Sequence, residues 1–308
     1  MLDQTKHNML PTMHLGAPTV VAPLTLFPIW TDAPVPDVPV PLEPPAEASI
    51  GELDSGPAVE LLTAKNPTPL PYVLLEGTIV DGGWQHRVLV HSVLVGAAAQ
   101  LDLPVRCVEQ GRWNGDTAQR LHRRRAPLGV RGATHGVRRP TEDSRVAGRV
   151  DQGDVWSRVA AYEQTYGASG THSLVEVLDQ AEVTDDLRAA VPRPLLGQRG
   201  VLVGVAGHPA LVEVFEHPDS LAQQWDALID GLLASTLHVP RKTTSTRRAR
   251  AFVDRLTNRA LPTRTAAGAG DLGETADDLV SIRALDAGDG RTIHATALNV
   301  RHDLVLAA

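Results

Sequence analysis

The apolar positions of this chain follow two different periods. Within 153–166 and 220–233 they recur every three or four residues, which predicts amphipathic helices. Within 88–95 they form a β-branched run, and within 101–107 they alternate with polar residues; both patterns are typical of strands. The chain therefore contains helices and strands, and the order of the two indicates the fold class.

Strand patterns predominate early and late in the chain, and helical patterns lie between them. Further strands are expected at 19–30, 50–62 and 72–80, the last interrupted at Glu76–Gly77, and two hairpins are expected from 200–206 with 210–215 and from 279–285 with 291–300. Further helices are expected at 116–125, 173–181, 185–191 and 246–259, and Ser173 and Glu176 are placed as a capping box. This order predicts an α+β fold with a mostly antiparallel sheet, or sheets, and a central helical segment packed on one side.

The same patterns suggest how the chain divides. Residues 1–18 have no apolar period, so we expect them to be disordered or loosely attached. Residues 19–308 are predicted to form a single α+β domain. Within it we expect a proline-rich, extended connection over 33–48 and an arginine-rich loop over 126–149.

Charge is unevenly distributed along the chain. The 308 residues carry a net charge of −7, yet 120–149 holds nine arginines against two acidic residues. The segment 240–264 is equally basic, with seven arginines and one lysine against one acidic residue. Contact with phosphate groups is one interpretation of these blocks. Neither block interleaves its arginines with aromatic residues, so we interpret them mainly as solvated surfaces and do not expect nucleic acid as a partner.

Composition bounds the class of protein. A hydrophobic content of 43% supports a sizeable core, and an aromatic content of 4% makes that core aliphatic. No apolar run approaches the roughly 18–20 residues of a membrane span, and no signal peptide is evident. The single cysteine excludes an internal disulfide and a cysteine-rich zinc site. We therefore expect a cytoplasmic protein with no membrane partner.

The densest chemistry flanks the strands on either side of Gly96. We expect these strands to form an antiparallel hairpin, in which the start of one strand lies beside the end of the other. This geometry would bring Gln85 and Arg87, before the hairpin, close to Glu109 and Arg112, after it. The hairpin thus predicts that polar residues converge at one end of a sheet.

Two carboxylates are candidates for catalysis. Glu76 and Glu109 could act as an acid–base pair, or hold Mg²⁺ through their oxygens, if they approach each other. Alternatively they belong to a structural network with arginines, because Glu76 lies in an apolar strand and requires a partner if buried. Arg87 or Arg112 is the partner expected for Glu76.

Other side chains suit ligand binding. Guanidinium and amide groups form planar hydrogen bonds to a carboxylate, phosphate or amide, and tryptophan can stack on a base. The candidate ligand-binding residues are Gln85, Arg87, His91, Gln110, Arg112 and Trp113. The histidines do not show metal-ligand spacing, so no metal site is predicted. Cys107 shares a face with apolar neighbours, which favours a buried small hydrophobe over a nucleophile.

Several motifs resemble a known family. The run LLEG, followed by CVEQGRW and later by QGDVW, WDALIDGLL and GRTIHATALN, is similar to the ARG and rhodanese-phosphatase-superfamily-associated protein domain. The resemblance covers most of 19–300. The family name implies an association with ADP-ribosylglycohydrolases, enzymes of NAD-derived chemistry. Where the family is expected to have an acidic pair, this chain has Thr78 and Ile79, which would fit a binder or an inactive member.

Three functions are compatible with these observations. The first is an accessory or sensor domain that recognises a nucleotide-derived anion related to ADP-ribose or NAD. The second is a hydrolase of a phosphorylated or ADP-ribosylated substrate that uses Glu109, with or without a divalent metal. The third is a structural interaction protein without catalytic activity. The sequence identifies no cofactor and no oligomeric state.

Overall fold

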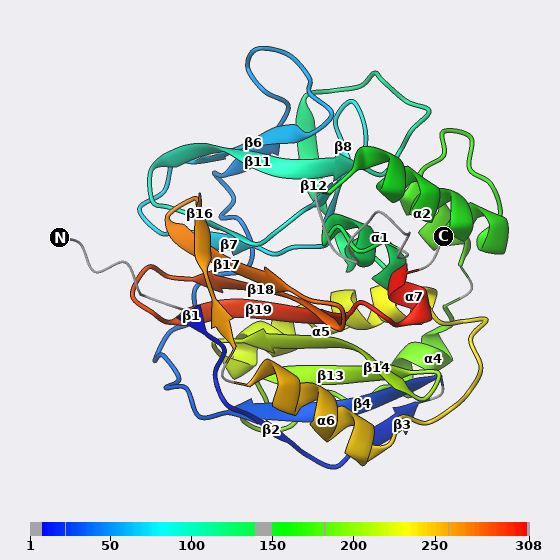
Figure 1. The fold of residues 1–308 in the computed structure, drawn as a ribbon. Helices are drawn as coiled ribbons and strands as arrows, with labels where there is room; N and C mark the ends of the chain where they lie inside the picture. The colour runs from blue at the N-terminus through cyan, green and yellow to red at the C-terminus, as the bar shows by residue number, and fades with distance from the viewer. Residues whose placement is uncertain (1–7, 22, 139–149, 182, 258, 307–308) are drawn as a thin grey trace.

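The computed structural model describes residues 8–21, 23–138, 150–181, 183–257 and 259–306. Figure 1 shows a small closed barrel above a large sheet. Neighbouring strands within both are antiparallel. With the helices that surround them, these strands confirm the predicted α+β fold.

The large sheet combines the two ends of the chain. Its strand order is β16-β17-β18-β19-β14-β13-β4-β2, and β3 also pairs with β4. The hairpins β13–β14 and β18–β19 confirm the predicted ones, whereas β16–β17 was not predicted. The strands are β2 Met13–Leu15, β3 Thr19–Val21, β4 Leu24–Thr31, β13 Gly200–Val205, β14 His208–Phe215, β16 Thr263–Ala267, β17 Gly270–Ala276, β18 Val280–Asp286 and β19 Thr292–Asn299.

The barrel comes from the first third of the chain and closes in the order β11-β6-β5-β12-β8-β9. Its strands are β5 Ser49–Gly51, β6 Leu61–Asn66, β8 Thr78–Gly82, β9 Arg87–Leu89, β11 Ala99–Cys107 and β12 Ala118–Arg125. Two further pairs lie outside it: β7 Tyr72–Leu74 with β10 Val93–Val95, and β1 Asn8–Met9 with β15 Ala260–Leu261. Strands β7 and β8 confirm the predicted interruption between them.

The central hairpin is only partly as predicted. Strand β11 pairs with β9, from Val105 opposite Leu89 to Cys107 opposite Arg87. The predicted strand 88–95 is broken, however, and β10 pairs with β7 instead. The break lies at Ser92, whose Oγ accepts a hydrogen bond from the Glu76 amide at 3.0 Å. The polar pair His91–Ser92 thus makes contacts elsewhere rather than continuing the ladder.

Two predictions for the basic region between the barrel and the helices are wrong. The expected helix at 116–125 is strand β12, which pairs with β8 and β5. Within the expected loop 126–149, residues Leu128–Thr134 form helix α1, and every residue of α1 is buried. Gly132 allows this packing, because a Cβ there would lie 2.2 Å from the Val305 carbonyl oxygen. Residues 139–149 of the expected loop lie outside the described residues.

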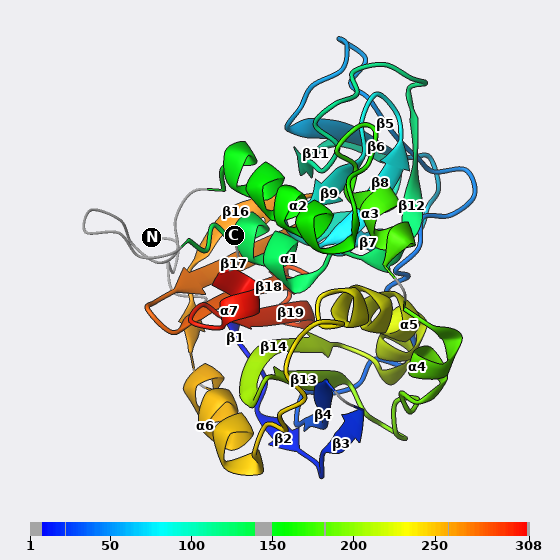
Figure 2. The same cartoon turned by 90° about the vertical axis from the view of Figure 1, so that its right-hand side faces the viewer.

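The other predicted helices begin and end close to the expected positions. They are α2 Gln152–Tyr166, α3 Leu174–Gln180, α4 Asp185–Ala189, α5 Pro218–Ala234 and α6 Thr246–Leu256. The short helix α7 Asp303–Leu306 was not predicted. Ser173 caps α3 as predicted, because its side chain accepts the Glu176 amide. Helices α5 and α6 cover opposite faces of the large sheet (Figure 2). None of the described helices is long and apolar enough to cross a membrane.

Three apolar clusters hold these layers together. One fills the barrel, and a second lies between α6 and the sheet. The third joins the outer barrel residues Ile79 and Val88 to α1, α2, α3, α5 and the other face of the sheet. The barrel and the sheet therefore share one core.

The N-terminal segment differs from the expectation of loose attachment. Among the described residues of 1–18, β2 pairs with β4 and β1 pairs with β15. Leu10 and Met13 are buried in the core beneath α6. The proline-rich connection 33–48 contains neither a helix nor a strand, and Leu42 within it is buried.

Candidate functional site

The interior of the barrel changes from apolar to polar toward one end. Leu89 and Val105 belong to the apolar barrel core. Because side chains two residues apart share a face of a strand, Arg87 and Cys107 also point inward. On the opposite wall Gln119 faces inward beside Ile50 of the same core. A buried arginine and a buried glutamine thus form the polar end of the barrel.

Glu52 and Gln85 complete this end. Gln119 Nε2 donates to the Gln85 carbonyl oxygen at 3.1 Å and to Glu52 Oε1 at 3.4 Å, and the Trp84 amide donates to Glu52 Oε1 at 3.0 Å. Gly83 lets these groups approach, because a Cβ there would lie 2.0 Å from Gln119 Nε2. We call the following residues the barrel-end cluster: Glu52, Gln85, Arg87, Glu109, Arg112 and Gln119.

The predicted convergence of the two polar segments is confirmed. Gln85 Nε2 donates to the Glu109 carbonyl oxygen at 3.0 Å. Arg112 Nη1 donates to the Gly83 carbonyl oxygen at 2.6 Å, and Nη2 donates to that of Gly82 at 3.1 Å. The loops before β9 and after β11 are therefore directly bonded to each other.

Arg112 has no donor left for a ligand. A guanidinium carries five N–H groups. Nε and Nη2 bond the two carboxylate oxygens of Glu109 at 2.9 and 2.7 Å. Nη1 also donates to the Asn114 carbonyl oxygen at 2.8 Å, in addition to its bond to Gly83. With the Gly82 bond, all five donors are used, so these contacts favour a positioning role for Arg112.

Glu109 is similarly saturated. Besides the two bonds from Arg112, its Oε1 accepts the Thr171 hydroxyl at 2.8 Å and its Oε2 accepts the His86 amide at 2.9 Å. Burial alone would raise the pKa of Glu109, but the hydrogen bonds from Arg112 and the His86 amide lower it below its usual value. A general base requires a lone pair free to take a proton. These contacts therefore also favour a positioning role for Glu109.

Arg87 differs from Arg112 and Glu109 because most of its side-chain donors are not hydrogen-bonded. Its side chain is fully buried, and only Nη2 is bonded, to the Ala58 carbonyl oxygen at 3.2 Å. Burial lowers the pKa of Arg87, with nearby Cys107 and Glu52 opposing that shift. In the described part of the chain, five buried atoms of the barrel-end cluster lack a hydrogen-bond partner: Nε and Nη1 of Arg87, Oε1 of Gln85, Oε1 of Gln119 and Oε2 of Glu52.

Trp113 lies at the rim of this polar end. The Arg87 guanidinium is 5.9 Å from the centre of its ring, within the range of a cation–π contact. Trp84 meets the same ring edge-on at 5.6 Å. Trp113 is 44% exposed, so its ring contacts the buried guanidinium as well as the solvent.

Besides Trp113, which lies at the rim, three of the predicted residues are not part of the barrel-end cluster. Glu76 bonds Arg131 at 3.2 Å and His135 at 3.1 Å, so the expectation that it pairs with Arg87 or Arg112 is wrong. His91 contacts the backbone carbonyl of its neighbour Ser92.

Gln110, the third predicted residue outside the barrel-end cluster, is exposed. Glu76 and Glu109 have no hydrogen-bond partner in common among the described residues, so the structure does not assemble the expected carboxylate pair.

Cys107 is buried in the barrel, as its alternation with apolar residues predicted. Its Sγ lies 3.2 Å from the carbonyl oxygen of Glu109 and 3.3 Å from the amide of that residue. Burial raises the pKa of the Cys107 thiol. A protonated, enclosed thiol has the properties of a packing residue rather than of a nucleophile.

A second polar cluster, which the sequence analysis missed, lies between the barrel and the sheet. Arg131 of α1 bridges Glu76 at 3.2 Å and Glu213 at 2.8 Å. Arg125 of β12 bonds the second oxygen of Glu213 at 3.1 Å. All four side chains are at most 3% exposed. We call them the barrel–sheet network. Glu213 was detectable, because it interrupts an apolar strand as Glu76 does, but its partners were not.

Each glutamate of this network also begins a row of hydrogen bonds. Glu76 contacts His135, whose Nδ1 lies 2.9 Å from Ser281 Oγ. Glu213 contacts His294 at 3.0 Å, and Nδ1 of that ring lies 2.9 Å from Ser92 Oγ. The two rows connect strands of the sheet to α1 and to the barrel. They give hydrogen-bond partners to the buried carboxylates and histidines. Nε and Nη1 of Arg125 and Nε of Arg131 have no partner among the described residues.

This burial predicts sensitivity to acid. Burial lowers the pKa of His135 below its usual 6.5, and nearby Arg283 lowers it further although Glu76 opposes the shift. The unfolded chain therefore takes up a proton near pH 6.5 that the folded chain refuses, so stability is present above pH 6.5 and falls below it. Glu76, with its pKa well below 4.5, adds a further loss below pH 4.5.

Melting temperatures measured by circular dichroism between pH 7.5 and 4 should test this expectation. We expect a steady decline below about pH 6.5, and a shallower decline for His135→Gln relative to its own value at pH 7.5. A melting temperature that stays constant from pH 7 to pH 5 would contradict it.

The chain is similar to one known domain family over most of its length. The sequence model described as the ARG and Rhodanese-Phosphatase-superfamily-associated Protein domain matches residues 12–298. No curated protein and no solved structure matches the chain.

Proposed function

The chain belongs to the ARG and rhodanese-phosphatase-superfamily-associated protein domain family, and we propose that it recognises a small anionic ligand at the polar end of its barrel. The observation that carries this proposal is the buried Arg87, which has two unbonded donors and a tryptophan beside it. The mouths of β-barrels are a preferred place for ligand sites. Recognition without turnover fits an accessory or sensor role.

The unbonded atoms define the chemistry of the ligand. Nε and Nη1 of Arg87 have no partner among the described residues, and each can donate to an oxygen of a carboxylate or a phosphate. The free oxygens of Glu52, Gln85 and Gln119 can accept from hydroxyl or amide groups of the same ligand. A phosphorylated sugar presents both kinds of group, and Trp113 can stack on a ring attached to it. These features support a nucleotide-derived ligand of the ADP-ribose or NAD type.

Hydrolysis receives less support from the same geometry. Glu109 was the candidate base, and four hydrogen bonds hold both of its oxygens. A saturated carboxylate with a lowered pKa stabilises the loops around a site more readily than it accepts a proton. We therefore propose that Glu109 and Arg112 fix the frame of the site and that Arg87 contacts the ligand.

Replacing Arg87 with methionine tests the proposal. Isothermal titration with ADP-ribose, with and without Mg²⁺, should give binding to the natural chain and at least a tenfold loss for Arg87→Met. The free energy of unfolding should fall by less than about 1 kcal/mol, because an apolar side chain of similar volume replaces an incompletely bonded buried charge. Arg120→Met is a matched control, since the Arg120 side chain is 84% exposed.

Two outcomes would contradict the proposal. One is ADP-ribose binding that Arg87→Met leaves unchanged. The other is a folded Arg87→Met variant that has lost several kcal/mol of stability, which would make Arg87 a structural residue. Release of products from ADP-ribose derivatives, followed by NMR and lost in Glu109→Gln, would favour the hydrolase instead.

A further inference from the structure

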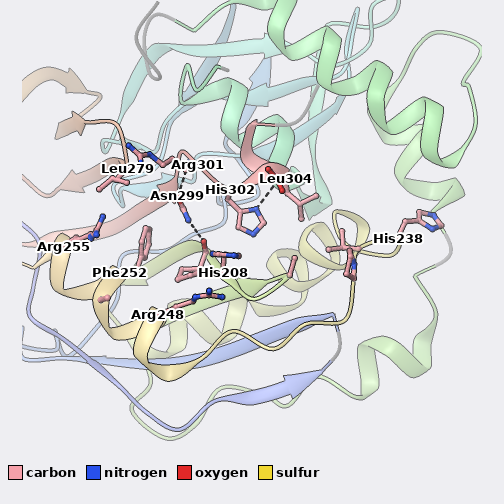
Figure 3. Close-up of a pocket in the computed structure, with 16 residues that line it drawn as sticks. His208, His238, Arg248, Phe252, Arg255, Leu279, Asn299, Arg301, His302 and Leu304 are labelled. Atoms are coloured by element: carbon pink, nitrogen blue, oxygen red, sulfur yellow. Dashed lines mark hydrogen bonds between the residues drawn. The ribbon is translucent and has the colours of Figure 1, made fainter. Parts of the chain in front are cut away.

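A cleft of about 790 Å³ lies against the large sheet, away from the barrel-end cluster. Helix α6 forms one wall, the turn between β13 and β14 forms the base, and the chain after β19 forms the opposite wall (Figure 3). Its volume lies within the range of small-molecule sites. None of its lining residues belongs to the barrel-end cluster.

The wall from α6 is basic. Arg248, Phe252 and Arg255 follow one another at spacings of four and three residues, so they share one face of the helix. Arg248 Nη1 donates to the Gly207 carbonyl oxygen at 2.6 Å, which orients the guanidinium without neutralising it. The Arg255 side chain has no hydrogen bond or ion pair to any described residue. Two positive charges on this face therefore lack a carboxylate partner.

The opposite wall adds polar groups around an apolar patch. Asn299 Nδ2 donates to the Pro209 carbonyl oxygen at 2.8 Å, which ties the end of β19 to the base of the cleft. Arg301 forms an ion pair with Asp278, so its charge is largely compensated. Among the residues that line the cleft, Asp303 is the one carboxylate.

The apolar part of the cleft comes from both walls. Phe252 and Leu279 line it between the arginines, as Figure 3 shows. Phe252 is 7% exposed, so it offers the cleft only part of one ring. A planar group could pack there while its charged substituent reaches Arg248 and Arg255.

We propose that this cleft binds a nucleoside di- or triphosphate, with the phosphates on Arg248 and Arg255 and the base against Phe252 and Leu279. Arginine forks suit phosphate oxygens, and two uncompensated guanidinium groups favour a ligand with more than one negative charge. The site gives a role to part of the basic block 240–264, and it is independent of ligand binding at the barrel end.

Titration calorimetry with ADP, pyrophosphate and adenosine tests both halves of the site. ADP should bind most tightly, because pyrophosphate lacks the base and adenosine lacks the charge. Arg248→Gln combined with Arg255→Gln should weaken ADP binding at least tenfold. Arg255→Gln alone removes one charge inside the cleft and should weaken ADP binding several-fold, whereas Arg250→Gln removes one charge from α6 outside the cleft and should change the affinity less than twofold. Binding should weaken as salt is raised from 50 to 300 mM.

The following results would contradict the proposal that this cleft binds a nucleotide. Equal losses in Arg250→Gln and Arg255→Gln would indicate non-specific attraction to a basic helix. Unchanged ADP binding in the double variant, or no binding by the natural chain at 10 mM ADP, would overturn the proposal. Arg87→Met should leave ADP binding at the cleft intact, so the ADP titrations are made in that background. The ADP-ribose titrations at the barrel end are repeated in the variant with Arg248→Gln and Arg255→Gln. Each site is then measured without the other, and failure at the barrel end can be told apart from failure at the cleft.

Discussion

Arg131→Met is expected to lower the free energy of unfolding by about 3–5 kcal/mol, the cost of breaking a buried ion pair by removing one partner. Arg131 contacts both Glu76 and Glu213, and each of these carboxylates is at most 3% exposed. Arg131 also supplies a charge that holds the pKa of Glu213 far below its usual value despite burial, after the larger contribution of Arg125. Methionine would leave both carboxylates with less compensation inside the core.

Urea unfolding followed by fluorescence measures this loss. Arg120→Met, on the exposed surface of β12, is the control and should change stability by less than about 0.5 kcal/mol. Because replacing a whole buried network with apolar residues is often tolerated, a variant with Glu76, Glu213, Arg125 and Arg131 all replaced should recover part of the loss. A stability of Arg131→Met within 1 kcal/mol of the natural chain would show that the network contributes little.

Arg112→Ala is expected to lower stability by about 2–3 kcal/mol, because it removes five hydrogen bonds and leaves Glu109 without its ion-pair partner. The effect should be smaller than at Arg131, since the Arg112 side chain is 21% exposed and water can partly replace it. Arg112→Lys should recover little, because an ammonium group cannot bond both oxygens of Glu109 and the three carbonyl oxygens together.

The comparison of Arg112→Ala with Arg87→Met separates the frame of the site from its contact with a ligand. We expect a lower melting temperature in the first variant and lost ADP-ribose binding at near-normal melting temperature in the second. A stable Arg112→Ala variant that has lost only binding would assign the ligand contact to Arg112 and reverse the roles proposed for the two arginines.

Periodicity alone predicted much of the fold. The apolar stripes of α2 and α5, the Ser173 cap and the hairpins β13–β14 and β18–β19 all follow from patterns within about 15 residues. The pairing of β9 with β11 likewise brought Gln85 to Glu109, as hairpin geometry requires. These features depend on interactions between neighbours in the sequence, which a sequence displays directly.

The basic region between the barrel and the helices shows where such patterns fail. An arginine-rich segment resembles a solvated loop, because a charged side chain is normally exposed. Here Arg125 and Arg131 are buried, because Glu76 and Glu213, from distant strands, compensate them. The local sequence contains no record of those partners, so both β12 and α1 were predicted wrongly.

The sequence by itself determined the fold class, most helices and the meeting of the two polar segments around β9 and β11. Only the tertiary structure decided which arginine has unbonded nitrogens. Arg112 and Arg87 are equivalent as residue types, yet all three nitrogens of Arg112 are bonded, whereas Nε and Nη1 of Arg87 have no partner among the described residues. The reason is physical: periodicity reports local packing, whereas hydrogen-bond satisfaction depends on groups that folding brings from elsewhere in the chain.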